Sequence, residues 1–224
     1  MQTKELYLFD ICGTLYRSNT TYDFLKFYFK RNNKGKYLRY RMCLSLPAKV
    51  LWKFLTFAGK RYKVRKFLIG FLKNEDVSLV TSEAHFFVKE YLNDRKINPI
   101  HQQLLEAKKN PKTEIWLISA SISPVVEAIA SSLGVSRFVA TSLEHSNHNF
   151  TGEITEELEG KKQQILNDLG ILKPSISAVV FTDSKEDKEL VFMAQEAYIV
   201  GKNVPQEFWK NYVSEKTSLH FILY

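Results

Sequence analysis

The sequence predicts an α/β protein in which a parallel sheet carries helices on both faces and a helical bundle follows the first strand. Three observations support this prediction. Residues 5–10 form a short apolar run that ends in a carboxylate, as a buried strand does before a turn. Residues 21–93 place apolar side chains at helical spacing, and from residue 110 onward strand-like runs alternate with helical segments.

The composition suits a folded chain. Of its 224 residues, 45% are apolar and 25% are charged, which is ordinary for a globular protein with one large core or a core and an inserted domain. The two cysteines, Cys12 and Cys43, do not make a disulfide framework or a zinc site, so we expect a reducing compartment.

The chain shows no export or membrane-spanning pattern. Its first apolar run meets Asp10 too early for a secretory signal, and residues 42–59 contain Lys49, Lys53 and Pro47. We therefore predict a cytoplasmic protein.

The helical insertion after the first strand has breaks that predict four or five helices. They fall near residues 32–35, 47, 59 and 73–76. We expect residues 17–104 to form this insertion, a cap domain, and residues 1–16 and 105–224 to form the α/β core.

The second half of the chain predicts βα units. Pro124 near the start of one helix and Gly134 at its end match helix-capping preferences. Strands are expected at residues 114–119, 138–141, 178–181 and 197–200, helices at 123–134, 160–169 and 187–196, and a hairpin arm at 150–154. In the remaining tail, 205–224, the aromatic residues Phe208, Trp209 and Tyr212 are expected to dock on the core.

Polar side chains follow the predicted strands. Because ligands of open parallel sheets bind at the carboxyl ends of the strands, we expect these side chains to meet at one edge. They are Asp10, Cys12, Gly13 and Thr14; Ser119; Lys161 and Lys162; and Asp183, Ser184 and Asp187. A carboxylate nucleophile, a hydroxyl, an ammonium and further carboxylates for Mg²⁺ are what phosphoryl transfer through an aspartyl phosphate requires.

Four motifs stand in order at these strand ends: LYLFDICGTLY, WLISAS, EGKKQQIL and VVFTDSKED. The chain thereby resembles the haloacid dehalogenase superfamily over about residues 5–200. Its helical insertion is similar to that of the phosphoserine-phosphatase-like branch, and the sequence IWLISASISPVVEAIA resembles members that dephosphorylate phosphatidylglycerophosphate. The resemblance implies a three-layer Rossmann-like core, a helical-bundle cap and a Mg²⁺-dependent phosphatase.

The resemblance also implies roles for individual residues. Asp10 would be the nucleophile and, with the main-chain carbonyl of Cys12 and the carboxylate of Asp183, a ligand of Mg²⁺. Ser119 would bind the phosphoryl group. Gly13, Thr14 and Ala120 would assist it, one of Lys161 and Lys162 would neutralise it, and Ser184 and Asp187 would support the site from behind. Gly160, directly before Lys161, slightly favours Lys161 over Lys162 as the lysine that neutralises the phosphoryl group.

Two positions depart from the family pattern. Cys12 stands where most phosphatases of the family have an aspartate that protonates the leaving group and then activates water, and Thr182 replaces a glycine. A thiol has a pKa of about 8.5 against about 3.9 for the aspartate carboxyl, so Cys12 is a poor base at neutral pH. The alternatives are a slow phosphatase, which we favour, a chain that keeps its phosphoenzyme for transfer, and a site that only binds. Thr182 is expected to add bulk beside the metal site.

Simpler interpretations exist for each residue taken alone. Asp10 would be a turn residue, Ser119 or Asp183 a helix cap, and the two lysines a solvated helix start. The order of all four at strand ends favours the site.

The basic residues of the chain lie in one block. From Lys26 to Lys73 there are fifteen Lys or Arg and no Asp or Glu; because the chain carries +8, the remainder carries −7. This block indicates peripheral contact with an anionic membrane, or a solvated cap; nucleic acid is the less favoured partner. We therefore predict a phosphatase acting on a small or lipid-linked phosphate. The alternative is a catalytically impaired protein that binds Mg²⁺ and phosphate and whose basic cap engages a membrane or nucleic acid.

Overall fold

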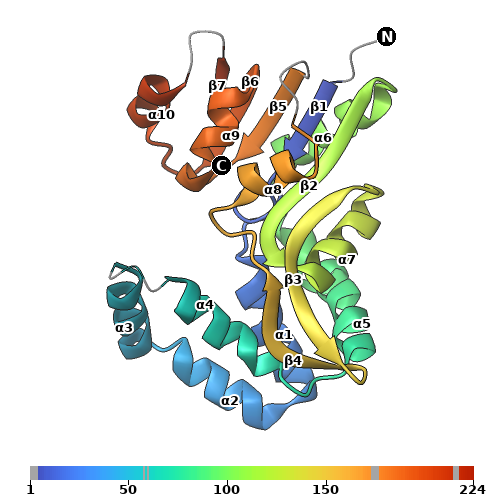
Figure 1. Ribbon diagram of the computed structural model, residues 1–224, viewed down its shortest axis with the longest axis vertical. Helices are drawn as coiled ribbons and strands as arrows, with labels where there is room; N and C mark the ends of the chain where they lie inside the picture. Colours follow the sequence, from blue (N-terminus) through green and yellow to red (C-terminus); the bar gives the residue numbers. More distant parts are fainter. Residues whose placement is uncertain (1–4, 58, 60, 173–176, 214–216) are drawn as a thin grey trace.

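The computed structural model describes residues 5–57, 59, 61–172, 177–213 and 217–224, and in them one seven-stranded sheet organises the chain (Figure 1). The strands lie in the order β4-β3-β2-β1-β5-β6-β7, and only β4 runs antiparallel to its neighbour. They are β1 (Glu5–Phe9), β2 (Thr113–Ile122), β3 (Phe138–Ser146), β4 (Asn149–Glu156), β5 (Ser177–Thr182), β6 (Glu196–Gly201) and β7 (Ser218–Leu223). This confirms the predicted α/β class.

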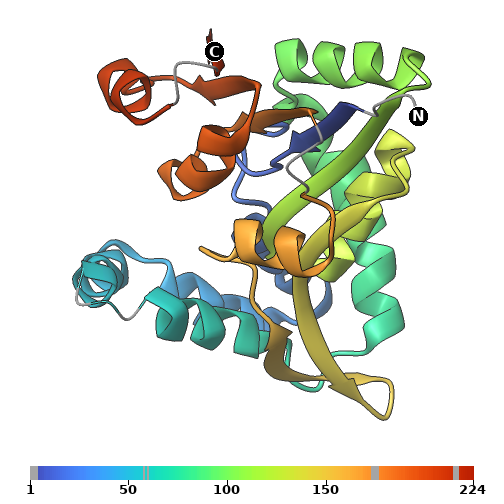
Figure 2. The same cartoon turned by 45° about the horizontal axis from the view of Figure 1, so that its top comes forward.

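The insertion between β1 and β2 is helical, as predicted. Its elements are α1 (Thr20–Asn32), α2 (Lys34–Cys43), α3 (Leu46–Phe57), α4 (Arg61–Ile69), the 3₁₀ turn η1 (Gly70–Leu72), α5 (Val77–Phe87), the π turn η2 (Val88–Leu92), the 3₁₀ turn η3 (Asn93–Arg95) and α6 (Asn98–Lys109). Helices α2, α3 and α4 lie to one side of the sheet (Figure 2). The expected boundary at 104–105 falls within α6, so the division into domains stays a prediction.

The remaining helices follow the strands of the core. They are α7 (Ser123–Leu133), α8 (Lys162–Asp168), the 3₁₀ turn η4 (Lys185–Asp187), α9 (Lys188–Met193) and α10 (Gln206–Tyr212). Helix α7 begins with Pro124 in its first turn and ends at Gly134, whose φ of 60° is the left-handed conformation that glycine adopts readily.

Two sequence predictions need correction. The helix expected over 187–196 ends at Met193, because the Gln195 N–H already donates to Ala178 O in the sheet (2.9 Å). The tail contains a strand that the sequence analysis did not predict, β7, which pairs with β6 in parallel.

The sheet separates two apolar cores. Along β1, Leu6 and Leu8 join the cluster beneath α8, α9 and α10, whereas Phe9 joins the cluster that continues through α7 into the cap. This alternation follows from the period of two in a strand. Both faces of β1 are therefore covered by protein, which explains its apolar composition.

Trp209 anchors α10 on the core, as the sequence analysis expected, and is almost fully buried. We expect Trp209→Ala to lower the free energy of unfolding by about 3–5 kcal/mol, because a large buried side chain leaves a cavity. Urea denaturation measures this loss. Phe192→Ala on α9, where the side chain is half exposed, is the control and should cost less than about 1 kcal/mol; equal losses for both variants would contradict the anchoring role.

Strand β1 marks the point where the strand order reverses. After β1 the chain builds β2 and β3 on one side of it and then β5, β6 and β7 on the other. Connections that leave in opposite directions open a crevice at the carboxyl end of such a strand, where ligands of this architecture bind.

Candidate active site

Asp10 lies in this crevice, one residue after the end of β1. Its N–H donates to Phe181 O of β5 (2.9 Å), which continues the sheet and fixes the residue. The carboxylate is buried and accepts hydrogen bonds from Lys162 Nζ (2.7 Å) and Thr14 Oγ1 (3.2 Å). Burial raises the pKa of Asp10 against the opposing effect of Lys162.

Lys162 joins two of the predicted carboxylates. Its Nζ lies 2.7 Å from Asp10 Oδ1 and 2.8 Å from Asp187 Oδ2. Burial alone would lower the pKa of this lysine, but the two carboxylates outweigh burial and raise it. The site therefore contains a permanent positive charge that contacts Asp10 directly.

Lys162, and not the slightly favoured Lys161, contacts Asp10; which of the two binds phosphate stays a prediction. Lys161 occupies the N-cap position of α8 and its side chain is exposed, so it lies outside the cavity that contains Asp10. Lys162, one residue further along, points inward. The difference is one of helix phase, since successive residues of a helix point about 100° apart.

Asp183 approaches the Gly13 turn closely. Gly13 has φ +71°, and a Cβ placed on it would lie 2.0 Å from Asp183 Oδ2. Glycine is therefore required both by the backbone and by this approach. The Gly13 N–H donates to Tyr16 O (2.8 Å) and closes the turn.

The charges around Asp183 fit a divalent cation. Although Asp183 is exposed at the cavity mouth, the protein around its carboxyl group and the nearby charge of Asp10 raise its pKa to about 7. Asp10, Asp183 and Asp187 line one cavity, and Lys162 contacts two of them, Asp10 and Asp187. Among the described residues no group of three or more His, Cys, Asp or Glu side chains forms a ready-made metal site. Two carboxylates supplemented by a main-chain oxygen are nevertheless the hard oxygen ligands that Mg²⁺ prefers.

The side chain of Thr182 contacts Asp187, whereas the sequence predicted that it adds bulk beside a metal site. It is fully buried in β5, its hydroxyl donates to Asp187 Oδ2 (2.6 Å), and its Oγ1 accepts from the Ser184 N–H (3.0 Å). Ser184 in turn caps η4 by accepting from the Glu186 N–H. Thr182 therefore holds the Asp187 carboxylate in contact with Lys162. The sequence predicted that Asp187 orients the lysine in this way.

The cavity above Asp10 has a volume of about 360 Å³. Ser119 and Ala120 of β2 line it, as predicted, together with Ser121. Gly13 and Thr14 are not part of its lining; Thr14 supports Asp10 from the buried side.

Cys12 lies in the same cavity, among hydroxyl groups. Its Sγ is 3.1 Å from Thr20 Oγ1 of α1 and 3.2 Å from Ser121 Oγ of β2. Burial, and secondarily the charge of Asp10, raise the pKa of the thiol. Cys12 is therefore protonated at neutral pH.

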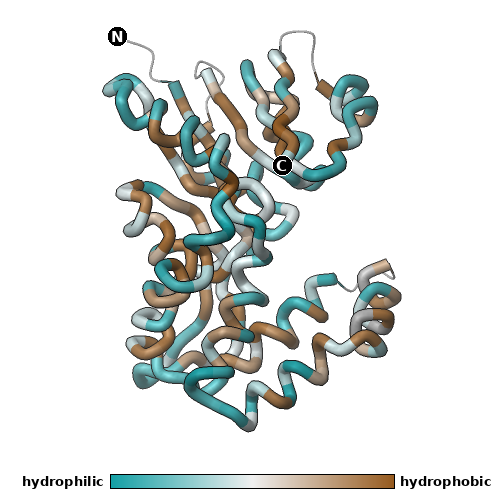
Figure 3. Tube along the Cα trace, turned by 180° about the vertical axis from the view of Figure 1, so that it is seen from behind, coloured by the Kyte–Doolittle hydropathy of each residue, from teal (hydrophilic) through white to brown (hydrophobic). Residues whose placement is uncertain are grey.

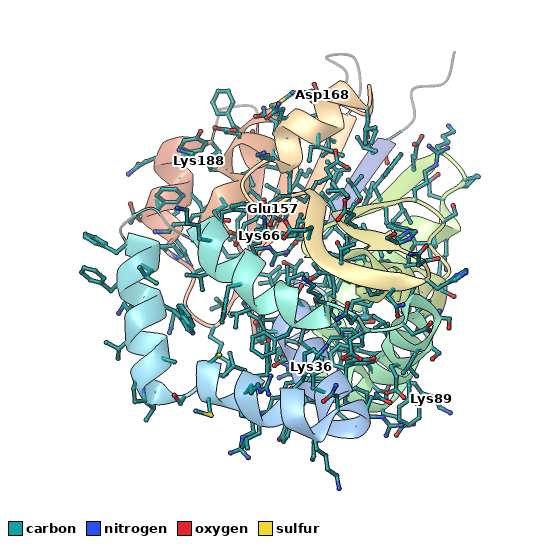
Figure 4. All side chains as sticks on the ribbon, turned by 60° about the horizontal axis from the view of Figure 1, so that its bottom comes forward. Lys36, Lys66, Lys89, Glu157, Asp168 and Lys188 are labelled. Atoms are coloured by element: carbon teal, nitrogen blue, oxygen red, sulfur yellow. The ribbon has the colours of Figure 1, made fainter. Side chains whose placement is uncertain are left out.

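Two arginines of α4 complete the cavity, and the sequence analysis missed them. Arg65 is buried and donates to Glu157 (2.9 Å) and to Ala120 O, while Arg61 pairs with Glu159 (2.6 Å) and with Glu186. Figure 4 places Glu157 beside α4. The spacing of four, which puts both arginines on one helix face, was the available signal.

Comparisons with known proteins agree with the fold. A model of the haloacid dehalogenase-like hydrolases matches residues 7–191. Among solved structures, a Bordetella pertussis Tohama I protein described as of unknown function is similar, with a TM-score of 0.79 and 17% identity over 98% of this chain and 99% of that one. A phospho-aspartyl intermediate analogue of phosphoserine phosphatase gives a TM-score of 0.57 at 17% identity, covering 99% and 94% of the two chains.

A third structure, a phosphoserine phosphohydrolase-like protein from Francisella tularensis subsp. tularensis SCHU S4, gives a TM-score of 0.56 at 17% identity, covering 96% of this chain and 94% of that one. At these identities the likeness concerns the fold. No curated protein matches the chain by sequence. Within the described residues, no helix combines the length and apolar character needed to cross a bilayer.

Proposed function

The chain belongs to the haloacid dehalogenase-like hydrolase family, and from this premise we propose that it is a Mg²⁺-dependent phosphomonoester hydrolase that acts through an aspartyl phosphate on Asp10. One observation carries the proposal: the buried carboxylate of Asp10 lies at the bottom of a polar cavity and contacts the ammonium of Lys162. A carboxylate held beside a fixed cation is arranged to attack an anionic phosphoryl group.

The chemistry follows from the placement of these groups. An Asp10 oxygen forms a bond to phosphorus while the bond from phosphorus to the leaving oxygen breaks, and the leaving oxygen then takes a proton from solvent. Lys162 and Ser119 would bind phosphoryl oxygens as charge develops on them. Water then attacks the phosphorus of the aspartyl phosphate and loses a proton to solvent, while the bond from the Asp10 oxygen to phosphorus breaks. Inorganic phosphate leaves and the carboxylate of Asp10 is regenerated.

Asp10, Asp183 and the main-chain carbonyl of Cys12 would hold Mg²⁺, as the family resemblance implies. When bound, the ion would neutralise charge on a phosphoryl oxygen. The raised pKa of Asp183 supports this assignment, because a carboxylate disfavoured by burial and by the nearby charge of Asp10 is stabilised by a cation. Lys161, which lies outside the cavity, is not included in the proposed phosphate ligands.

The substrate is proposed to be a small phosphorylated compound or a lipid-linked phosphate. The cavity volume of about 360 Å³ admits a phosphate group with a small leaving group. The buried guanidinium of Arg65 is already paired with Glu157, so it is not proposed as a ligand of the substrate phosphate. The basic cap supports an anionic substrate or surface.

A second candidate function is favoured by the Cys12 thiol. Because its pKa is raised, it is a poor base for activating water. A chain that binds Mg²⁺ and phosphate with little or no turnover would have the same site, and its basic cap would then act as the interaction surface.

Rapid mixing of the protein with a chromogenic aryl phosphate tests the proposal. We expect release of the aryl alcohol in a burst or at a steady rate in the presence of Mg²⁺, its loss on chelation with EDTA, and its return when Mg²⁺ is added back. Release that is unchanged by EDTA would contradict the metal assignment. Absence of release, together with calorimetric binding of Mg²⁺ and inorganic phosphate, would favour the second candidate.

A further inference from the structure

Helix α3 exposes an apolar face to solvent. Its residues Leu46, Val50, Phe54 and Phe57 have 80%, 71%, 67% and 93% of their surface exposed. Spacings of four, four and three put them on one side of the helix. Figure 3 shows α3 as a largely hydrophobic segment at an edge of the molecule, away from the sheet. We call these four residues the apolar ridge.

The other side of α3 already has a packing role. Trp52 and Leu55 pack against the apolar cluster of the cap, and the Trp52 Nε1–H donates to Cys43 O (2.6 Å). The ridge is therefore not needed to attach α3 to the cap. Leu38 and Met42 of α2, one turn apart, are also largely exposed and add to the apolar surface.

The ridge lies in the most basic segment of the sequence. This segment, Lys26 to Lys73, has fifteen basic residues and no acidic one; in the part of the chain that the structure describes, five of the fifteen pair with glutamates from elsewhere in the chain. Exposed cations occur on α3 and on the helices before and after it in the chain: Lys53 on α3, Arg39 and Arg41 on α2, and Lys63 on α4. A cavity of about 570 Å³ between α2 and α4 is lined by Lys36, Arg39, Lys63 and Lys66 around Phe67, and also by Glu153. Lys66 pairs with Glu153 (2.5 Å) and Lys36 with Glu75 (2.6 Å), so among the described residues Arg39 and Lys63 carry the free positive charge there; Figure 4 shows Lys36 and Lys66 on these two helices.

We propose that the apolar ridge inserts into an anionic lipid surface, where the surrounding cations contact the headgroup phosphates. Apolar side chains flanked by lysine and arginine match the two layers of such a surface, acyl chains beneath anionic headgroups. The proposal concerns a surface distinct from the Asp10 cavity and holds whether or not the chain is a phosphatase.

Charge argues against the other occupants. Two copies of the chain meeting through their ridges would bring two strongly positive segments together, which repel. Nucleic acid would satisfy the cations but leave the ridge in water. An anionic lipid surface satisfies both features.

Co-sedimentation with vesicles tests the proposal. The protein is mixed with vesicles of phosphatidylcholine alone or with phosphatidylglycerol added, at low and high salt. We expect binding to the anionic vesicles, weakened by salt. The double variant Phe54→Ser/Phe57→Ser should bind the anionic vesicles at least about tenfold more weakly than the unmodified protein, because binding scales with the apolar area inserted.

A matched control removes apolar surface elsewhere. Leu105→Ser/Leu169→Ser replaces two side chains of 56% and 59% exposure, on α6 and just after α8, and should bind as the unmodified protein does. Circular dichroism verifies that all variants are folded. The proposal is overturned if the unmodified protein does not bind anionic vesicles, or if both double variants bind equally well. A concentration-dependent dimer in sedimentation velocity that only the ridge variant loses would also overturn it, in favour of a second copy.

Discussion

Asp10→Asn is expected to abolish both the burst and the steady release of aryl alcohol while the fold remains intact. The amide of asparagine is not a nucleophile toward phosphorus, so no aspartyl phosphate forms. Lys162 retains Asp187 at 2.8 Å and is not left as an unpaired buried charge. Rapid-mixing kinetics with an aryl phosphate and Mg²⁺ measure the loss.

The stability of this variant should move in the opposite direction from its activity. Burial raises the pKa of Asp10 in the folded state, so at neutral pH its ionised form disfavours the metal-free fold. Asp10→Asn removes that penalty, and its melting temperature without Mg²⁺ should equal or exceed that of the unmodified protein. The stabilisation produced by adding Mg²⁺ should decrease.

Asp168→Asn provides the control for charge. Asp168 is the last residue of α8, is exposed, and lies on the outside of the molecule in Figure 4. This variant should keep full activity. Retention of turnover by Asp10→Asn would remove Asp10 from the role of nucleophile, and equal losses in the two variants would point to a nonspecific effect.

The sequence predicted those parts of the fold and site that depend on local pattern. The apolar run before Asp10, the Pro124 and Gly134 signals of α7 and the alternation of strands and helices each depend on neighbouring residues. Topology then brings Asp10, Ser119 and Asp183 to one edge of the sheet, because parallel strands end on the same side. For these three residues, the position at the end of a predicted strand was enough to predict that they lie together.

Other features depend on phase or on distant contacts. Which of Lys161 and Lys162 points into the cavity depends on the residue at which α8 begins. The sequence of so short a helix does not predict its first residue to within one position. Arg65 meets Glu157 across 92 residues of sequence, and no local pattern encodes that pairing. Strand β7 has only exposed or partly buried side chains, so its apolar residues were a weak signal of a strand.

Cys12→Asp is expected to raise steady turnover of an aryl phosphate about tenfold or more. General acid–base catalysis by a positioned side chain is typically worth roughly 10²–10⁴-fold, and the raised pKa of the Cys12 thiol prevents it from acting as a base. The surroundings suit a carboxylate at position 12. The hydroxyls of Thr20 and Ser121 lie 3.1 Å and 3.2 Å from Cys12 Sγ and can donate hydrogen bonds to a carboxylate placed there.

Cys12→Ser separates the acid–base effect from a change of shape. Serine matches cysteine closely in size and has no titratable group near neutral pH, so its turnover should remain near that of the unmodified protein. Burst amplitude and steady rate then identify the limiting step. A burst in the unmodified protein followed by turnover only in Cys12→Asp means that Asp10 is competent and that water activation is the missing step. If neither variant changes the rate, Cys12 does not limit turnover and the explanation for a slow enzyme is withdrawn. An equal increase in both variants would assign the effect to removal of the thiol and not to a new base.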